Sequence, residues 1–98
     1  MLWSRGIYNI ITKEKVEYVK IYNYDGKKNL CGNRIREARM LKRMSQSDLA
    51  AKMQTEGIIL ERDSISRIEI GTRFVADYEL MIFARVLKVN VEWLLATS

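Results

Sequence analysis

The chain has 98 residues, enough for one compact domain built around a single hydrophobic core. Its apolar fraction of 48% and charged fraction of 30% are those of an ordinary globular protein. No stretch approaches the roughly 20 consecutive apolar residues of a membrane span, and no long apolar block follows the amino-terminal MLWSR. These features exclude a membrane-spanning or largely disordered chain and predict a cytoplasmic protein without a secretory signal.

Residue types that commonly carry catalysis are scarce in the sequence. It has no histidine and one cysteine, Cys31, so it lacks the usual zinc ligands, the commonest general base and any disulfide pair. Cys31 would need a partner that lowers its pKa in order to act as a nucleophile. We expect Cys31 to be a reduced thiol near a helix start. We also expect no enzymatic activity, no metal, no cofactor and no small-molecule substrate.

Positive charge is concentrated before residue 45. Residues 1–30 carry a net charge of +3, residues 31–44 carry +4 and residues 45–98 carry −2, which together give the net charge of +5. A concentrated basic region is typical of a polyanion binder, because each neutralised phosphate releases condensed counterions. A merely solvated basic surface would have the same composition.

The first thirty residues have the composition of strands. Residues 16–24 are rich in β-branched and aromatic side chains, and residues 6–11 form a shorter candidate strand. Residues 12–15 would connect the two as a β-hairpin, and Asp25-Gly26 would turn the chain out; a helix or a poorly ordered leader are the alternatives. A two-stranded hairpin is marginal alone. We therefore expect residues 1–30 to form an N-terminal extension that packs on the helices or pairs with another chain as a dimerisation arm.

Residues 31–98 have the pattern of a bundle of five helices, so the predicted fold class is mainly α. Ser45 and Asp48 form a short-armed capping box before the second helix, and Gly71 suits the left-handed conformation that ends the third. Asp77 and Asn90 are the expected N-caps of the fourth and fifth. The predicted helices run from 33 to about 43, from 46 to about 54, from between 61 and 63 to 70, from behind 77 to about 87, and from behind 90 towards the end.

Apolar side chains at helical spacing mark the side that each helix should bury. The connecting loop 55–62 carries an apolar run, Ile58-Ile59-Leu60, that we expect to tuck onto the bundle. Trp93, Leu94 and Leu95 are expected to complete the core or a dimer contact. The helical core positions are Ile35, Ala38, either Leu41 or Lys42, Leu49, Ala50, Met53, Ile65, Ile68, Leu80, Phe83, Ala84 and Leu87.

Three separated motifs then stand in order along the chain. They are SQSDLA at 45–50, ISRIEIG at 65–71 and VNVEWLL at 89–95. Together they resemble the lambda-repressor-like (Xre/Cro-type) helix-turn-helix family over about residues 32–96. The resemblance implies a five-helix bundle whose second and third helices read DNA. It also implies a transcriptional regulator, here a repressor, that binds double-stranded operator DNA as a homodimer.

The resemblance also assigns roles to individual residues. The third helix of such proteins presents its first side chains to base edges in the major groove, while the helix before it anchors to the backbone. Gln46 then matches a phosphate contact, and Arg67 is the strongest candidate for base readout. Arg39 and Glu69 match an internal ion pair that holds the first and third helices together. The further expected DNA contacts are Arg62, Asp63 and Ser64 near the start of the third helix, Thr72 and Arg73 after it, and Arg43 after the first.

The sequence departs from the family pattern in one turn. Fifteen residues separate Leu49 from Ile65, so the connection 55–62 is longer than is typical and changes the register of Arg62 and Asp63 on DNA. A second function class is a protein-interaction module, such as an antitoxin or adaptor, built on the same fold. The acidic balance after residue 45 and the apolar hairpin candidate favour that alternative.

Overall fold

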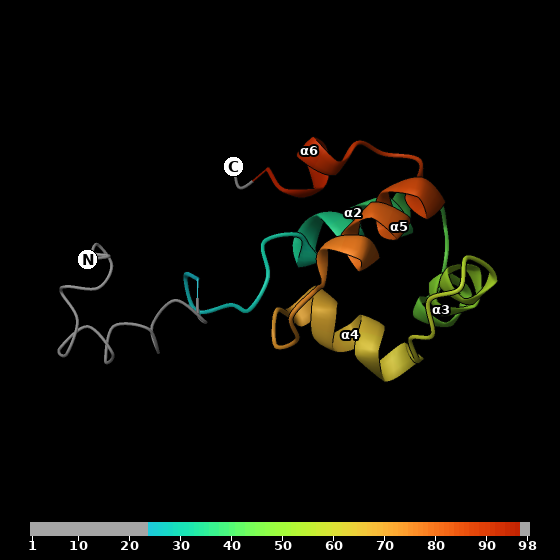
Figure 1. Ribbon diagram of the computed structural model, residues 1–98, viewed down its shortest axis with the longest axis horizontal. Coiled ribbons are helices and arrows are strands. Elements are labelled where there is room, and N and C mark those ends of the chain that lie inside the picture. Colours follow the sequence, from blue (N-terminus) through green and yellow to red (C-terminus); the bar gives the residue numbers. More distant parts are fainter. Residues whose placement is uncertain (1–23, 97–98) are drawn as a thin grey trace, which may run out of the picture.

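The structure, a computed structural model, describes residues 24–96 of the chain. In this part of the chain five helices follow one another: α2 (Gly32–Leu41), α3 (Gln46–Thr55), α4 (Arg62–Ile70), α5 (Asp77–Leu87) and α6 (Val91–Leu94) (Figure 1). The prediction of a mainly α, five-helix bundle is confirmed for these residues. The predicted hairpin of residues 6–11 and 16–24 lies outside the described residues, except for its last residue, Tyr24.

Two helix ends form as the sequence predicts. Before α3, Ser45 Oγ accepts a hydrogen bond from the Asp48 amide at 2.9 Å, and the Asp48 carboxylate accepts one from the Ser45 amide at 2.9 Å. Hydrogen bonding of the Asp48 carboxylate to the Ser45 amide, and then to the Ser45 side chain, lowers the pKa of the Asp48 carboxyl below its usual value. At the other end of the unit, Gly71 closes α4 with a φ of 100°, in the left-handed region. Both ends of the α3–α4 unit are therefore fixed by local sequence.

Of the expected N-caps of the last two helices, Asp77 is wrong by one residue and Asn90 is confirmed in position. Ala76 is the N-cap of α5, and Asp77 is its first helical residue. The helix starts there because the Glu79 carboxylate reaches back and accepts the Ala76 amide at 3.0 Å. Asn90 does precede α6, but its side chain makes no capping hydrogen bond. The start of α4, left open in the sequence, follows Glu61, whose side chain makes no capping bond either.

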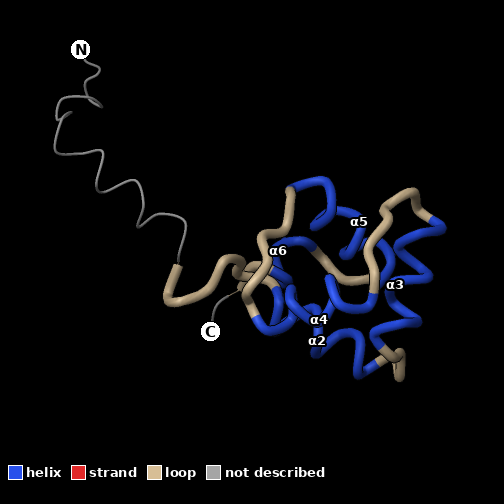
Figure 2. Tube along the Cα trace, turned by 90° about the horizontal axis from the view of Figure 1, so that it is seen from below, coloured by secondary structure: helices blue, strands red, loops and turns tan. Residues whose placement is uncertain are grey.

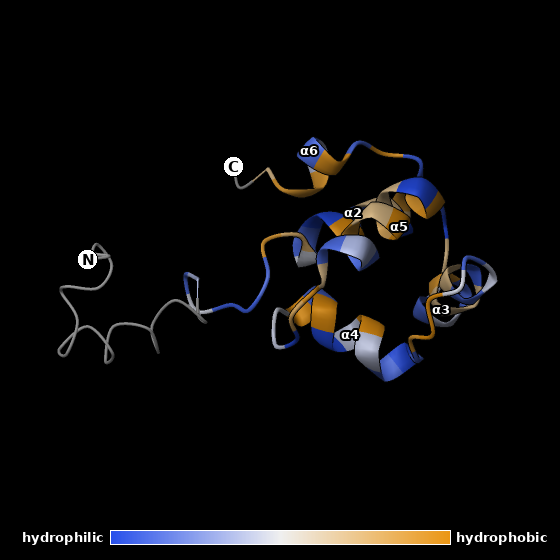
Figure 3. Cartoon of the chain, viewed as in Figure 1, coloured by the Kyte–Doolittle hydropathy of each residue, from blue (hydrophilic) through white to orange (hydrophobic). Residues whose placement is uncertain are grey.

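One hydrophobic core joins all five helices. Helix α4 packs against α2 and α3, and α5 packs against α2, α3 and α6 (Figure 2). Apolar residues occupy the inner faces of the ribbons, while the first turn of α4 is hydrophilic (Figure 3). In the connection after α3, Leu60 is buried and Ile58 half-buried, but Ile59 is 70% exposed, so the prediction for this run is wrong at Ile59. Leu94 is buried in the core, whereas Leu95 is exposed. Leu41 and Lys42 are both exposed at the end of α2, so the core prediction is wrong there.

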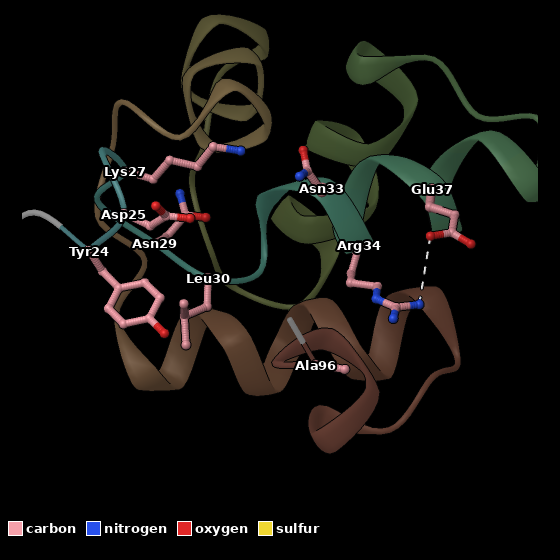
Figure 4. A pocket seen from close by; sticks show the side chains of 9 residues that line it. All are labelled: Tyr24, Asp25, Lys27, Asn29, Leu30, Asn33, Arg34, Glu37 and Ala96. Carbon is pink, nitrogen blue, oxygen red and sulfur yellow. Dashed lines mark ion pairs between the residues drawn. The ribbon is translucent and has the colours of Figure 1, made fainter. Parts of the chain in front are cut away.

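The chain enters the bundle through a tight turn. Asp25 and Gly26 both have positive φ, 53° and 77°, and Tyr24 and Lys27 exchange backbone hydrogen bonds of 2.7 and 2.8 Å across them. This is the turn that the Asp-Gly pair predicts. A pocket of about 290 Å³ lies between the turn, α2 and Ala96 (Figure 4). None of the helices within residues 24–96 has the length and apolarity needed to cross a membrane.

Candidate nucleic-acid interface

Helix α4 has one buried face and one exposed face. Ile65, Ile68 and Glu69 point into the bundle. Asp63 and Arg67, one helical turn apart, are exposed on the other side, and Ile70 continues that face with 63% exposure. Helix α4 carries two cations, Arg62 at its first position and Arg67 on the exposed face. Arg67 is the residue expected to read bases.

Glu69 joins three helices at the base of this face. Its carboxylate accepts hydrogen bonds from Arg39 Nε at 2.7 Å and from a second Arg39 nitrogen at 3.1 Å, which is the contact that the resemblance implies. The same carboxylate accepts the Gln46 side-chain amide at 3.0 Å. Arg39 also donates to the Met44 carbonyl at 2.8 Å. Because charged, bidentate hydrogen bonds are strong and directional, this cluster fixes α4 relative to α2 and to the start of α3.

A groove of about 260 Å³ lies beside the cluster. It is lined from α2 by Asn33 and Arg36, from α3 by Gln46, and from α4 by Ser66, Glu69 and Ile70. Sequence reasoning missed Arg36 and Ser66 as members of this surface. Ser66 follows Arg62 by four residues and precedes Ile70 by four, so helical periodicity alone places it on their side of α4. Arg36 had no such signal, because its neighbours in the groove come from other helices.

The first residues of α4 are linked to α3. Arg62 donates to Gln46 Oε1 at 3.5 Å and to the Asp63 carboxylate at 3.3 Å, and the Arg62 and Asp63 side chains are 60% and 74% exposed. The longer connection therefore still brings Arg62 next to Gln46, and Asp63 contacts Arg62. Ser64 is half-buried and precedes the buried Ile68 by one turn, so it lies towards the core and apart from this group.

The two expected contact residues in the loop after α4, Thr72 and Arg73, differ in exposure and in hydrogen bonding. Thr72 is exposed, and its amide donates to the Arg67 carbonyl at 2.9 Å. Arg73 instead donates to both oxygens of Glu79, at 3.1 and 3.2 Å, and to the Phe74 carbonyl at 2.8 Å. Burial by itself raises the pKa of the Glu79 carboxyl, but the Arg73 and Ala76 hydrogen bonds and the Arg73 charge outweigh burial and lower it. The Arg73 guanidinium is thus held against Glu79, with its side chain half-buried.

Arg43 stands between α2 and α3. It is exposed, and its φ of 57° places it in the left-handed region, where the chain turns from one helix towards the next. The first amides of a helix lack intrahelical acceptors and attract anions. Arg43 is an exposed cation two residues before Ser45, the N-cap of α3.

Cys31 is unsuited to nucleophilic chemistry. Its side chain is buried at the start of α2, and burial, countered in part by a backbone hydrogen bond, raises the pKa of its thiol to about 11. The thiol is therefore protonated at neutral pH. Within residues 24–96 no three or more His, Cys, Asp or Glu side chains gather in a way that would hold a metal ion.

The fold is similar to that of a solved structure. No family model matches the sequence, and no curated protein matches it. The crystal structure of the restriction-modification controller protein C.AhdI from Aeromonas hydrophila is similar, with a TM-score of 0.56 and 30% sequence identity. The match covers 64% of this chain and 84% of that protein. The chain belongs to the lambda-repressor-like (Xre/Cro-type) helix-turn-helix family.

Proposed function

We propose that this protein is a sequence-specific DNA-binding transcriptional regulator, a repressor that places α4 in the major groove of its operator. The observation that carries the proposal is the exposed face of α4 beside the start of α3, both fixed by the Glu69 cluster. An exposed helix face held rigidly against a second helix is what groove reading requires. The similar structure is that of a controller protein, which supports a regulatory and non-enzymatic role.

Within this proposal the exposed side chains divide by task. Arg67 and Asp63 contact base edges, because arginine can bond guanine bidentately and aspartate can accept from cytosine. Contacts to phosphates come from cations and helix amides around them. Arg73 supports the loop through Glu79 and makes no phosphate contact. The proposed phosphate-side group is Arg36, Arg43, Gln46, Arg62, Ser66 and Thr72.

The test begins with selection of bound duplexes from a random DNA pool. Binding of a selected duplex should weaken steeply with salt. Arg67→Ala should reduce the affinity ratio between selected and unselected duplex by about tenfold or more, the range expected for one lost base contact. Lys52→Ala is the matched control, because it removes one positive charge from an exposed position on α3 that lies outside the proposed DNA contacts and the proposed dimer face. An unchanged sequence preference in Arg67→Ala would show that this residue does not read bases.

We further propose that the regulator is a homodimer that pairs through α5. Tyr78 and Met81 are exposed on the same face of α5, with Asp77 and Arg85 towards its two ends. Two antiparallel copies of this face would bring apolar side chains together and set each Asp77 against the partner's Arg85. A two-fold pair of this kind also presents two α4 helices to a palindromic operator.

Sedimentation of the full chain tests this pairing. We expect a dimer that Met81→Glu converts to monomer, while Leu41→Glu, which charges an apolar residue exposed at the end of α2, leaves it dimeric. A dimer insensitive to Met81→Glu would direct attention to the extension of residues 1–30 as the dimerisation arm. Absence of DNA retention at low salt, together with a stable complex with another protein, would favour the interaction module, an antitoxin or adaptor.

A further inference from the structure

The segment that leads into α2 is fastened to the far end of α4. The Lys28 amide donates to the Gly71 carbonyl at 2.8 Å. The Asn29 side-chain amide donates to the Ile68 carbonyl at 3.1 Å and to the Arg73 carbonyl at 2.8 Å. All three acceptors lie in the last turn of α4 or in the loop after it. Residues 28–32, called the tether below, therefore supply donors to carbonyls that the helix itself leaves open.

Asn29 acts on two helices with one side chain. While its amide nitrogen holds the end of α4, its oxygen accepts the Gly32 amide at 2.8 Å, in the first turn of α2. The two helices are also in close approach at this point, because a Cβ on Gly32 would overlap the Ile68 carbonyl oxygen. The end of α4 is consequently positioned by the start of α2 through Asn29.

Lys27 closes the junction from the outside. Its side-chain methylenes lie about 3.0 Å from where a Cβ on Gly71 would be, so they cover the residue that ends α4. Gly71 is followed by Thr72, which bonds back to the Arg67 carbonyl. Lys27 and the tether thus contact the end of α4 and the loop after it, at Gly71. Neither of these contacts involves the outward face of α4.

We propose that Asn29 is a positioning residue for DNA recognition, which sets the end of α4 and thereby the base contact of Arg67 and the phosphate contact of Thr72. This inference rests on the proposed function. Its physical basis is that a base contact tolerates displacements of only about 0.5 Å in its supporting residues. The two donors of Asn29 restrain the last turn of α4 at the point where Gly71 would otherwise let it move.

Two substitutions in the full chain separate the donor role of the Asn29 side chain from its acceptor role. Asn29→Ala removes both the donors to α4 and the acceptor for α2. Asn29→Asp keeps an acceptor for the Gly32 amide, since aspartate caps helices well, but it loses the donors to Ile68 and Arg73. We expect both variants to lower the affinity ratio between selected and unselected duplex by about tenfold, the loss expected from two hydrogen bonds. Using the ratio removes the effect of the added charge.

Leu94→Val is the matched control, because it destabilises the core from α6, outside the tether and α4. It should leave the affinity ratio unchanged at temperatures where all variants are folded. Exchange of the Gly71 and Thr72 amides should quicken in Asn29→Asp and not in Leu94→Val. Full recovery of the ratio in Asn29→Asp would overturn the inference and leave Asn29 a cap of α2. If the unaltered chain retained no DNA, the proposed function would fall, and the inference with it.

Discussion

Two arginine–glutamate pairs in this molecule have the same chemistry in different places. Arg39 and Glu69 are separated by 30 residues and join α2 to α4, with side chains 12% and 3% exposed. Arg73 and Glu79 are separated by 6 residues and join the loop after α4 to the first turn of α5, with side chains 28% and 9% exposed. In each pair the carboxylate also accepts from a second group, Gln46 in one and the Ala76 amide in the other.

The difference shows how a fold allocates its positive charge. The pair between α2 and α4 organises the interface, because its glutamate also holds the start of α3. The pair after α4 organises a loop. Both arginines hold an internal carboxylate, and the Arg39 side chain is the more buried of the two. The two pairs leave the net charge of +5 unchanged, because each joins one positive and one negative charge. The surface that DNA would meet is therefore decided by the placement of exposed cations such as Arg36, Arg62 and Arg67.

The largest effect should come from breaking the pair between helices. Glu69→Ala leaves the Arg39 guanidinium largely buried without its partner and also releases Gln46. Loss of one member of a buried ion pair typically costs about 3–5 kcal/mol, so we expect a fall in the free energy of unfolding of about 3 kcal/mol or more, measured by urea denaturation. A loss below about 1 kcal/mol would mean that Arg39 finds solvent or another acceptor.

Replacing both members of the pair sharpens this test. In Arg39→Met with Glu69→Leu no charge remains to be satisfied, and apolar side chains of similar volume replace the pair. We expect the double variant to recover most of the stability that Glu69→Ala loses. It should still bind operator DNA more weakly than the unaltered chain, because Gln46 has no carboxylate to orient it. Retention of full affinity would remove Glu69 from the organisation of the interface.

A smaller effect should follow from breaking the pair after α4. Arg73→Met removes charge-assisted hydrogen bonds to a partly accessible site, and Glu79 keeps the Ala76 amide as a donor. We expect a loss of about 2 kcal/mol in the free energy of unfolding. The dependence of DNA affinity on salt should keep its slope, because Arg73 neutralises no phosphate. A slope reduced by about one would instead identify Arg73 as a phosphate contact, as the family resemblance implies.

Much of the bundle could be predicted from the sequence because its signals are local. The Ser45–Asp48 capping box, the glycine that ends α4 and the turn at Asp25-Gly26 depend on a few adjacent residues. The misplaced cap of α5 has a local cause too, since Glu79 competes with Asp77 for the start of the helix. The Arg39–Glu69 contact, although distant in sequence, was accessible through the family resemblance alone.

The remaining features depend on contacts that no local pattern reports. Asn29 bonds to carbonyls 39 and 44 residues away, and polar residues in a loop give no sign of such partners. Arg36 joins the groove beside α4 only because α2 and α4 pack side by side. The Arg73–Glu79 contact gives no sign in the sequence, because it depends on the geometry of the loop that joins α4 to α5.

The smallest expected effect is on the acid sensitivity of the folded chain, through the carboxyl of Glu79. Because the folded chain lowers the pKa of Glu79 below its ordinary value of 4.5, the unfolded chain takes up that proton at higher pH. The stability that Glu79 contributes is therefore fully present above about pH 4.5 and is lost as pH falls through the lowered pKa. We expect the urea midpoint to fall less between pH 7 and about pH 3 in Glu79→Gln than in the unaltered chain.

Asp48, whose pKa is also lowered, contributes to stability with the same sign. Asp48→Asn, at the start of α3, should therefore also reduce the fall of the urea midpoint with pH. The combined variant should reduce that fall by the sum of the two effects, since the two carboxyls lie in separate hydrogen-bonded groups. An acid profile unchanged in Glu79→Gln would show that Arg73 stabilises Glu79 equally in the folded and unfolded chain.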